Sequence, residues 1–261
     1  MRLAFQQKPG LVAYLTCGDP DLATTRQVAL AAIDAGADVI ELGVPFSDPV
    51  ADGPVIQRAS ERALKAGTSL HQVIALGAEL RRERPTAGLI IFTYLNPVLR
   101  MGMEAFAQQL SSGDIDGALI TDLSVEEAHE YVARMRSRQL ATVFLAAPTS
   151  PDRRLKAIAE FSQGFIYAVS RTGVTGEQQK LAADAAELVS RIRKFSTLPV
   201  AVGFGISGPE QFQRVGEFAD AAAIGSAIVS IIENHGRDSA EPVAKFIRGL
   251  RVGRSVARAE R

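Results

Sequence analysis

Residues 11–42 read LVAYLTCGDPDLATTRQVALAAIDAGADVIEL, and this stretch decides the fold because it contains one complete strand–helix–strand unit. The aliphatic run 11–16 predicts a buried strand, the amphipathic run 22–35 predicts a helix, and residues 39–42 predict the next strand. Asp19 and Pro20 mark the turn between the first strand and the helix. Two strands joined by a helix in this way lie parallel in one sheet.

The same alternation of short apolar runs and amphipathic stretches continues to the end of the chain. Strands are predicted at 11–16, 39–42, 89–93, 117–120, 142–146, 165–168, 200–202 and 221–224. Helices are predicted at 22–35, 55–65, 70–83, 104–110, 126–138, 153–161, 181–194, 209–215, 227–233 and 243–250. Eight strand–helix repeats predict an α/β protein with a (β/α)8 TIM barrel, formed as a single domain by residues 1–261.

A doubly wound open sheet is the competing architecture. It would carry a glycine-rich dinucleotide fingerprint after its first strand, and Thr16-Cys-Gly-Asp-Pro20 is not one. The barrel is therefore favoured.

Composition narrows the function classes. Lys plus Arg and Asp plus Glu number 29 each, so no excess positive charge attracts nucleic acid or an anionic membrane. No apolar run suits a signal peptide or approaches the ~18 residues of a membrane span, which predicts a cytoplasmic protein. Cys17 is the only cysteine, which excludes an internal disulfide and favours a small buried hydrophobe over a nucleophile. The three histidines lie far apart, so we expect no metal site.

Two acids lie close together in residues 41–53, ELGVPFSDPVADG. Glu41 interrupts an apolar strand, where an unpaired polar group costs roughly 2 to 7 kcal/mol and a carboxylate shifts its pKa upward. Such a carboxyl can both donate and accept a proton. Asp52 follows in a proline-rich loop, so the two acids can act on one substrate, one titrating high and the other low. The structural alternative for Glu41 is an ion pair with a buried Arg or Lys.

Glycines follow the last three predicted strands: 170–176 read SRTGVTG, 203–207 read GFGIS, and Gly225-Ser226 directly precede an apolar helical stretch. Glycines let backbone N–H groups approach an anion, and a helix N-terminus adds further donors. One such loop is explained by turn chemistry alone. Three at neighbouring strand ends predict a phosphorylated substrate, with the long loops 43–68 and 170–180 as candidate lids.

These segments make the chain similar to the tryptophan synthase alpha subunit family along nearly its whole length. The segments are 41–54 (ELGVPFSDPVADGP), 170–176, 203–207 and 225–229 (GSAIV), in the family's order and spacing. The resemblance implies a lyase of L-tryptophan biosynthesis that cleaves indole-3-glycerol phosphate to indole and glyceraldehyde 3-phosphate. It implies no metal or organic cofactor in this chain. It also implies a beta-subunit partner in an alpha2beta2 assembly, and that subunit carries pyridoxal phosphate and joins indole to serine.

By position, the resemblance implies that Glu41 and Asp52 are the catalytic acids. Glu41 would exchange protons at the breaking bond, and an ionised Asp52 would accept a hydrogen bond from the indole N–H. Tyr167 would orient the substrate, although a half-buried barrel tyrosine is the structural alternative. The other substrate-binding residues implied are Tyr14 and Phe204 as apolar walls and Thr175 in the lid, where it would hydrogen-bond Asp52.

The implied phosphate-binding residues are Gly176, Gly205, Gly225 and Ser226. The implied partner interface includes Asp48 and Asp122, with a helix-capping role as the alternative for Asp122. Two departures from the family stand out: the segment before the first strand is short, and Ser124 stands where the family usually has proline.

Two other functions remain open from the sequence. The chain could serve chiefly to bind and activate the beta subunit, with weak chemistry of its own. It could also be another phosphosugar barrel enzyme, such as an isomerase of a neighbouring biosynthetic step. Activity without a partner is open as well, because family members that release free indole use the same residues.

Overall fold

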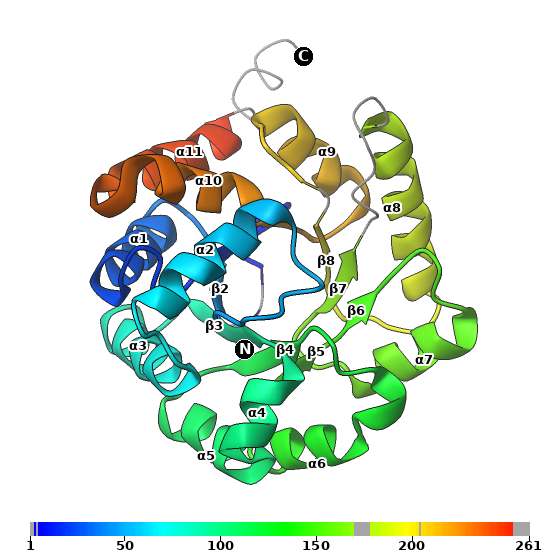
Figure 1. Ribbon diagram of the computed structural model, residues 1–261. Helices are drawn as coiled ribbons and strands as arrows, with labels where there is room; N and C mark the ends of the chain where they lie inside the picture. The colour runs from blue at the N-terminus through cyan, green and yellow to red at the C-terminus, as the bar shows by residue number, and fades with distance from the viewer. Residues whose placement is uncertain (1–2, 4, 170–177, 204, 253–261) are drawn as a thin grey trace.

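The computed structural model describes residues 3, 5–169, 178–203 and 205–252 (Figure 1). Its strands are β1 (Gly10–Thr16), β2 (Val39–Gly43), β3 (Gly88–Thr93), β4 (Gly117–Ile120), β5 (Ala141–Val143), β6 (Leu145–Ala146), β7 (Ile166–Val169), β8 (Val200–Gly203) and β9 (Ala221–Ile224). Its helices are α1 (Leu22–Asp34), α2 (Pro54–Lys65), α3 (Leu70–Glu83), α4 (Leu95–Met101), α5 (Met103–Ser112), η1 (Val125–Glu127), α6 (His129–Ser137), α7 (Asp152–Phe161), α8 (Gln178–Ile192), α9 (Pro209–Phe218), α10 (Ser226–His235), η2 (Gly236–Asp238) and α11 (Ala240–Val252). The strands lie in the centre and most helices form a ring around them, so the predicted α/β barrel is confirmed.

The described strands form one parallel sheet that closes on itself. Its order is β5-β4-β3-β2-β1-β9-β8-β7-β6, and β1 pairs with both β2 and β9. The two end strands are pieces of the segment predicted as one strand, 142–146, which is interrupted at Phe144. The Tyr167 N–H donates to the Phe144 carbonyl at 3.1 Å, so backbone hydrogen bonding continues across the interruption. The barrel thus has the predicted eight strand positions, one of them in two pieces.

Alternate strand residues fill the barrel interior. The buried interior side chains include Val12, Val39, Ile90, Leu119, Val143, Phe165, Ala201 and Ala221. Leu3 and Phe5 join this cluster, and the Phe5 ring lies 5.9 Å from the Phe165 ring. The opposite strand faces pack against the helices in a second, larger cluster. Because the interior is packed, the carboxyl ends of the strands are the place for a site.

Local sequence signals start several helices. The Asp21 side chain accepts a hydrogen bond from the Thr24 N–H at 2.8 Å and so caps α1. Pro54 and Pro209 stand in the first turns of α2 and α9, where a missing N–H costs nothing. These signals fix where each helix leaves its loop.

Three strands are preceded by an aspartate that binds the neighbouring strand at the amino end of the barrel. We call these residues, Asp38, Asp116 and Asp220, the aspartate clamps. They accept hydrogen bonds from the N–H groups of Leu11 at 2.8 Å, Leu89 at 2.8 Å and Val200 at 2.9 Å, respectively. They also form ion pairs with Arg251, Arg81 and Arg193, respectively. The clamps join β1 to β2, β3 to β4 and β8 to β9 at the end opposite the barrel mouth.

Helix α4 was not predicted. The Leu95 N–H at its start donates to Asp122 Oδ1 at 2.7 Å, and the helix ends at Gly102, whose φ is +90°. A cap from a distant loop leaves no trace in local periodicity, so the sequence did not reveal this helix. Similarly, the predicted helix 126–138 is divided into η1 and α6. None of the described helices is long and apolar enough to cross a membrane.

Candidate active site

Glu41 lies on β2, between Tyr14 of β1 and Ile90 of β3 in the strand register. It is two residues after Val39, which faces the barrel interior, so its side chain faces the interior as well. The residue is 1% exposed, and burial raises the pKa of its carboxyl to about 8. Its Oε1 has no hydrogen-bond partner and its carboxyl forms no ion pair among the described residues. Within that part of the chain the alternative of a buried Arg or Lys partner is wrong.

Asp52 lies in the loop after β2, two residues before α2. The Tyr94 hydroxyl donates a hydrogen bond to Asp52 Oδ2 at 2.9 Å and accepts one from the Ala51 N–H at 3.0 Å. Burial raises the pKa of Asp52, and the hydrogen bond from Tyr94 opposes that rise. Burial thus raises the pKa of both carboxyls, to about 8 for Glu41, because the Asp52 loop also removes its carboxyl from water. That Asp52 titrates low beside a Glu41 that titrates high stays a prediction.

Tyr94 was not singled out from the sequence. It directly follows β3, directly precedes α4, and stacks on Phe46 with ring centroids 4.9 Å apart. The residue is buried, and it contacts the Asp52 loop both through this stacking and through its hydroxyl. Its position at the carboxyl end of a strand was the one available signal, because that edge of the sheet forms the mouth.

Tyr14 and Tyr167 face the same interior as Glu41. Burial raises the pKa of each hydroxyl well above its usual value, and the charges of Asp52 and Glu41 raise it further. Glycines make room for both: a Cβ on Gly43 would lie 2.4 Å from Tyr14 Oη, and one on Gly203 would lie 2.7 Å from Tyr167 Oη. The Tyr14 ring packs edge-on against Phe92 at 5.0 Å. The structure thus brings both predicted tyrosines to the two acids.

The glycines after β8 and β9 lie at the same end of the barrel. Gly205 has a φ of +73°, a conformation that favours glycine. Gly225 precedes α10, which starts at Ser226, and a Cβ on Gly225 would approach the Tyr14 ring at 3.4 Å. The first N–H groups of α10 have no partner within the helix and can bind an anion. Three other predicted residues, Phe204, Thr175 and Gly176, lie outside the described residues.

The two acids predicted at a partner interface are exposed. Asp48 accepts a hydrogen bond from the Ser47 hydroxyl at 2.6 Å, within the loop that leads to Asp52. Asp122 caps α4 through the Leu95 N–H, so its capping alternative is confirmed. Ser124 donates a hydrogen bond to Glu127 at 2.8 Å and shapes the start of η1. A role of Asp48 and Asp122 in binding a partner stays a prediction.

Other reactive side chains offer no second centre within the described residues. Cys17 is fully buried, and burial raises the pKa of its thiol, which suits the predicted hydrophobic role. No cluster of three His, Cys, Asp or Glu side chains that could hold a metal ion is found among the residues described.

Comparisons with known proteins identify the family. A family model described as "Tryptophan synthase alpha chain" matches residues 1–254. The chain belongs to the tryptophan synthase alpha chain family. It is similar to the tryptophan synthase alpha chain of Solibacter usitatus, with 50% identity over 95% of this chain and 93% of that one. The alpha chain of Cupriavidus metallidurans is 46% identical over 95% of this chain and 94% of its own length.

Solved structures agree with this family. The tryptophan synthase alpha2beta2 complex of Pyrococcus furiosus contains a chain that superposes with a TM-score of 0.88 and 40% identity, covering 94% of this chain and 98% of that one. The resemblance inferred from the glycine loops and the 41–54 segment is therefore confirmed, and the protein is a lyase of this family. The matches favour this family over the other phosphosugar barrel enzymes that the loops alone allow.

Proposed function

We propose that this protein cleaves indole-3-glycerol phosphate to indole and glyceraldehyde 3-phosphate. One observation carries the proposal: the Glu41 carboxyl is buried in the barrel wall and has no partner for Oε1 among the described residues. It lies close enough to Tyr14 and Tyr167 for its charge to act on both hydroxyls, as the charge of Asp52 also does. An unpartnered buried carboxyl is costly to a fold and useful to a reaction that moves protons.

The cleavage is a retro-aldol reaction. The bond between indole C3 and the neighbouring carbon breaks, C3 gains a proton, and the hydroxyl on that carbon loses one to become the aldehyde. With a pKa of about 8, Glu41 is mainly protonated at neutral pH and can donate a proton to C3. The carboxylate that results can accept the hydroxyl proton as the bond breaks, which returns Glu41 to its starting state.

Asp52 stabilises the charge that develops when C3 is protonated. The protonated ring is cationic at its N–H, and an ionised carboxylate within hydrogen-bond distance lowers the energy of that species. Tyr94 holds the Asp52 carboxyl through its hydroxyl, which favours the ionised form. Tyr14 and Tyr167 supply ring surface on either side of the proposed indole position, where Phe204 and Thr175 are expected to complete the pocket.

The phosphate would bind at the N-terminus of α10, with Gly205, Gly225 and Ser226 and, as expected from the family, Gly176. Backbone N–H groups and the helix dipole attract the anion without an arginine or lysine. This grip fixes one end of the substrate, so the reacting bond meets Glu41 in a defined position.

A beta subunit is the proposed partner, because a solved relative is described as an alpha2beta2 complex. Asp48 and Asp122 are exposed at the barrel mouth and are the proposed contacts. We expect no cofactor in this chain, and pyridoxal phosphate would belong to the beta subunit. A cytoplasmic location stays a prediction.

Indole release from indole-3-glycerol phosphate by purified protein, with and without a beta subunit, tests the proposal. We expect turnover that the beta subunit accelerates, and a turnover at least about a hundredfold lower by Glu41→Gln protein. Binding of the beta subunit without any cleavage by the unmodified protein would overturn the proposal. That result would favour a protein kept chiefly to activate its partner.

A further inference from the structure

Asp52 and the proposed phosphate site lie on different elements, and nothing in the chemistry alone keeps them at a fixed separation. Asp52 stands two residues before α2, and the phosphate would bind at the start of α10. Helix α2 packs against α10 and crosses in front of the strands (Figure 1). Whatever fixes α2 on α10 therefore fixes Asp52 relative to the phosphate.

The inner side of this helix pair is apolar. Ala59 of α2 and Val229 of α10 pack together with Tyr14 in one buried cluster, and Val55 and Ile56 of α2 border it. Small and aliphatic contacts of this kind hold the helices together but allow sliding, because dispersion forces have little directionality.

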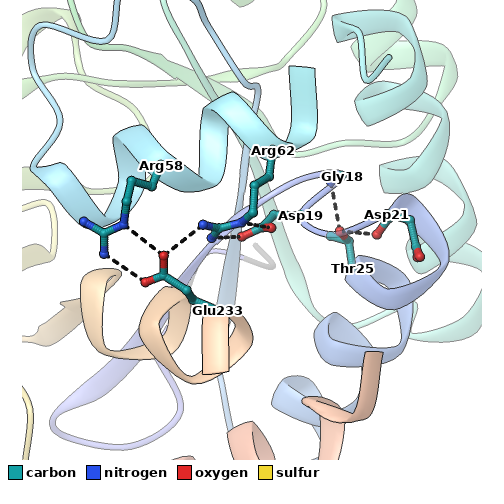
Figure 2. Close-up of polar contacts among 7 residues, drawn as sticks. All are labelled: Gly18, Asp19, Asp21, Thr25, Arg58, Arg62 and Glu233. Atoms are coloured by element: carbon teal, nitrogen blue, oxygen red, sulfur yellow. Dashed lines mark hydrogen bonds and ion pairs between the residues drawn. The ribbon is translucent and has the colours of Figure 1, made fainter. Parts of the chain in front are cut away.

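On the other side of the α2–α10 helix pair, a network of ion pairs joins the two helices (Figure 2). We call Asp19, Arg58, Arg62 and Glu233 the mouth network. Arg58 binds both carboxylate oxygens of Glu233 at 2.9 Å. Arg62 donates to Glu233 Oε1 at 2.9 Å and, with Nε and Nη2, to both oxygens of Asp19 at 2.8 Å.

Arg62 is the centre of this network because it joins two helices and one loop. Its guanidinium connects α2 to α10 through Glu233 and to the loop after β1 through Asp19. Asp19 is 3% exposed, so its carboxylate depends on Arg62 for compensation. A two-pronged arginine–carboxylate contact fixes orientation as well as distance, which packing alone does not.

The loop after β1 is held by hydrogen bonds of its own. The Gly18 N–H donates to Thr25 Oγ1 at 3.0 Å, and Thr25 Oγ1 donates to the Asp21 carbonyl at 3.0 Å (Figure 2). Gly18 has a φ of +90°, and a Cβ there would lie 1.9 Å from Thr68 Oγ1, just beyond the end of α2. The loop therefore contacts α2 both at its last turn, through Arg62, and beyond its end.

Glu233 relates the network to the phosphate site. It lies seven residues after Ser226 on α10, two helical turns along the same face and about 10 Å away at 1.5 Å per residue. A shift of α10 at its N-terminus therefore moves Glu233, and with it Arg62 and α2.

We propose that Arg62 is a positioning residue of the lyase reaction: by binding Asp19 and Glu233 together, it holds the Asp52 loop in register with the phosphate-binding end of α10. This inference rests on the proposed function. Arg62 touches no substrate in this scheme and acts only through the placement of Asp52 and α10.

The test measures kcat and KM for indole release from indole-3-glycerol phosphate, with saturating beta subunit, for Arg62→Met and Arg62→Lys proteins. Methionine keeps much of the side-chain length and removes the charge, whereas lysine keeps the charge without the fork. The matched control is Arg84→Met, because Arg84 makes an equally two-pronged contact with Asp34 at 2.7 Å between α3 and α1.

We expect Arg62→Met to lower kcat by about tenfold to a hundredfold, since a displacement near 1 Å can cost that much. KM should rise by a smaller factor, Arg62→Lys should recover part of kcat, and Arg84→Met should leave both constants unchanged. Unchanged kcat in a folded Arg62→Met protein would overturn the inference, as would an equal loss in Arg84→Met.

If Arg62→Met does not fold, Glu233→Gln serves as the second variant. Glutamine keeps the shape of the Glu233 side chain and weakens only the contact of α10 with the arginines of α2, so the pair of Arg62 with the buried Asp19 stays intact. This second variant should lower kcat in the same direction by a smaller factor, and an unchanged kcat would overturn the inference. The unmodified protein separates the two claims: no indole release by it contradicts the proposed function, whereas normal release by it and by folded Arg62→Met protein contradicts only the positioning role.

Discussion

Arg81 at the amino end of the barrel and Glu41 at its carboxyl end are both buried ionisable side chains, but they differ in their partners. At the amino end, Arg81 is 5% exposed and its guanidinium binds Asp116 and the carbonyls of Asp114, Pro85 and Ala87. At the carboxyl end, Glu41 is 1% exposed and Oε1 has no partner among the described residues. The ionisable group that serves stability is thus surrounded by partners, and the one that serves chemistry is left without them.

Because of this difference, we expect mutations at the two ends to affect different properties, stability at one end and activity at the other. Removing the guanidinium at the amino end should damage the fold and leave the chemistry of the folded molecules intact. Removing the ionisable carboxyl of Glu41 should abolish the chemistry and relieve the fold. The predictions below test this contrast, beginning with the largest effect.

Glu41→Gln tests the catalytic end most directly. The amide keeps the shape of the side chain but can neither donate nor accept the proton that the cleavage requires. We expect kcat to fall by about a hundredfold to ten-thousandfold. Indole formation under saturating indole-3-glycerol phosphate measures it. A Glu41→Gln protein with normal turnover would remove the contrast between the two ends.

Arg81→Met tests the structural end. Breaking a buried ion pair from one side costs about 3 to 5 kcal/mol, because the remaining group loses its compensating charge. Urea unfolding should show this loss, while kcat per folded molecule stays unchanged. Arg84→Met, which removes an exposed ion pair with Asp34, is the control and should cost much less stability. Equal losses in the two variants would contradict the role of burial.

The pH dependence of stability should also distinguish the ends. The folded pKa of Glu41, about 8, lies above its ordinary value of 4.5, so the folded state binds the proton more tightly than the unfolded chain does. The protonated Glu41 therefore contributes its full stabilisation below the ordinary pKa of 4.5, and this contribution is lost as the pH rises through the folded pKa of about 8. The unmodified protein should therefore lose on the order of a few kcal/mol relative to Glu41→Gln between about pH 5 and pH 9. If the free energies of unfolding of the two proteins changed with pH in parallel, Glu41 would ionise as easily in the folded state as in the unfolded chain, and the prediction would be wrong.

Tyr94→Phe should give the smallest effect and sharpen the account of Asp52. The hydroxyl lowers the pKa of Asp52, so its removal raises that pKa and moves the acidic limb of the kcat–pH profile to higher pH. We expect kcat to fall by up to about tenfold at neutral pH. Tyr131→Phe is the control, because the buried Tyr131 hydroxyl binds only the Ala118 carbonyl at 3.0 Å among the described contacts. If the acidic limb of the kcat–pH profile shifted in Tyr131→Phe protein as well, the shift in Tyr94→Phe protein could not be attributed to Asp52.

The sequence predicted the residues whose chemistry conflicts with their surroundings. Glu41 stood out because a carboxylate interrupts an apolar strand, and Gly225 because it directly precedes a helix at a strand end. The strand positions followed from the alternation of apolar runs and helices. Such features are local, so they can be detected without knowledge of the fold.

Features made by distant residues could not be predicted in this way. Tyr94 reaches Asp52 across 42 positions, and Arg62 reaches Glu233 across 171. The raised pKa of Asp52 was missed for the same reason, because the burial of a loop depends on what packs over it. The single-domain organisation, the partner contacts and the roles of Phe204, Thr175 and Gly176 stay predictions.

The aspartate clamps have a consequence for how the chain reaches this structure. Their backbone hydrogen bonds close loops of only 27, 27 and 20 positions, whereas the pairing of β1 with β9 joins Gly10 to Ala221. Closing a short loop sacrifices less chain entropy, so contacts of this kind can form before distant ones. We expect folding to begin separately at the three clamped strand pairs. The hydrogen bonds between β1 and β9 should be among the last to form.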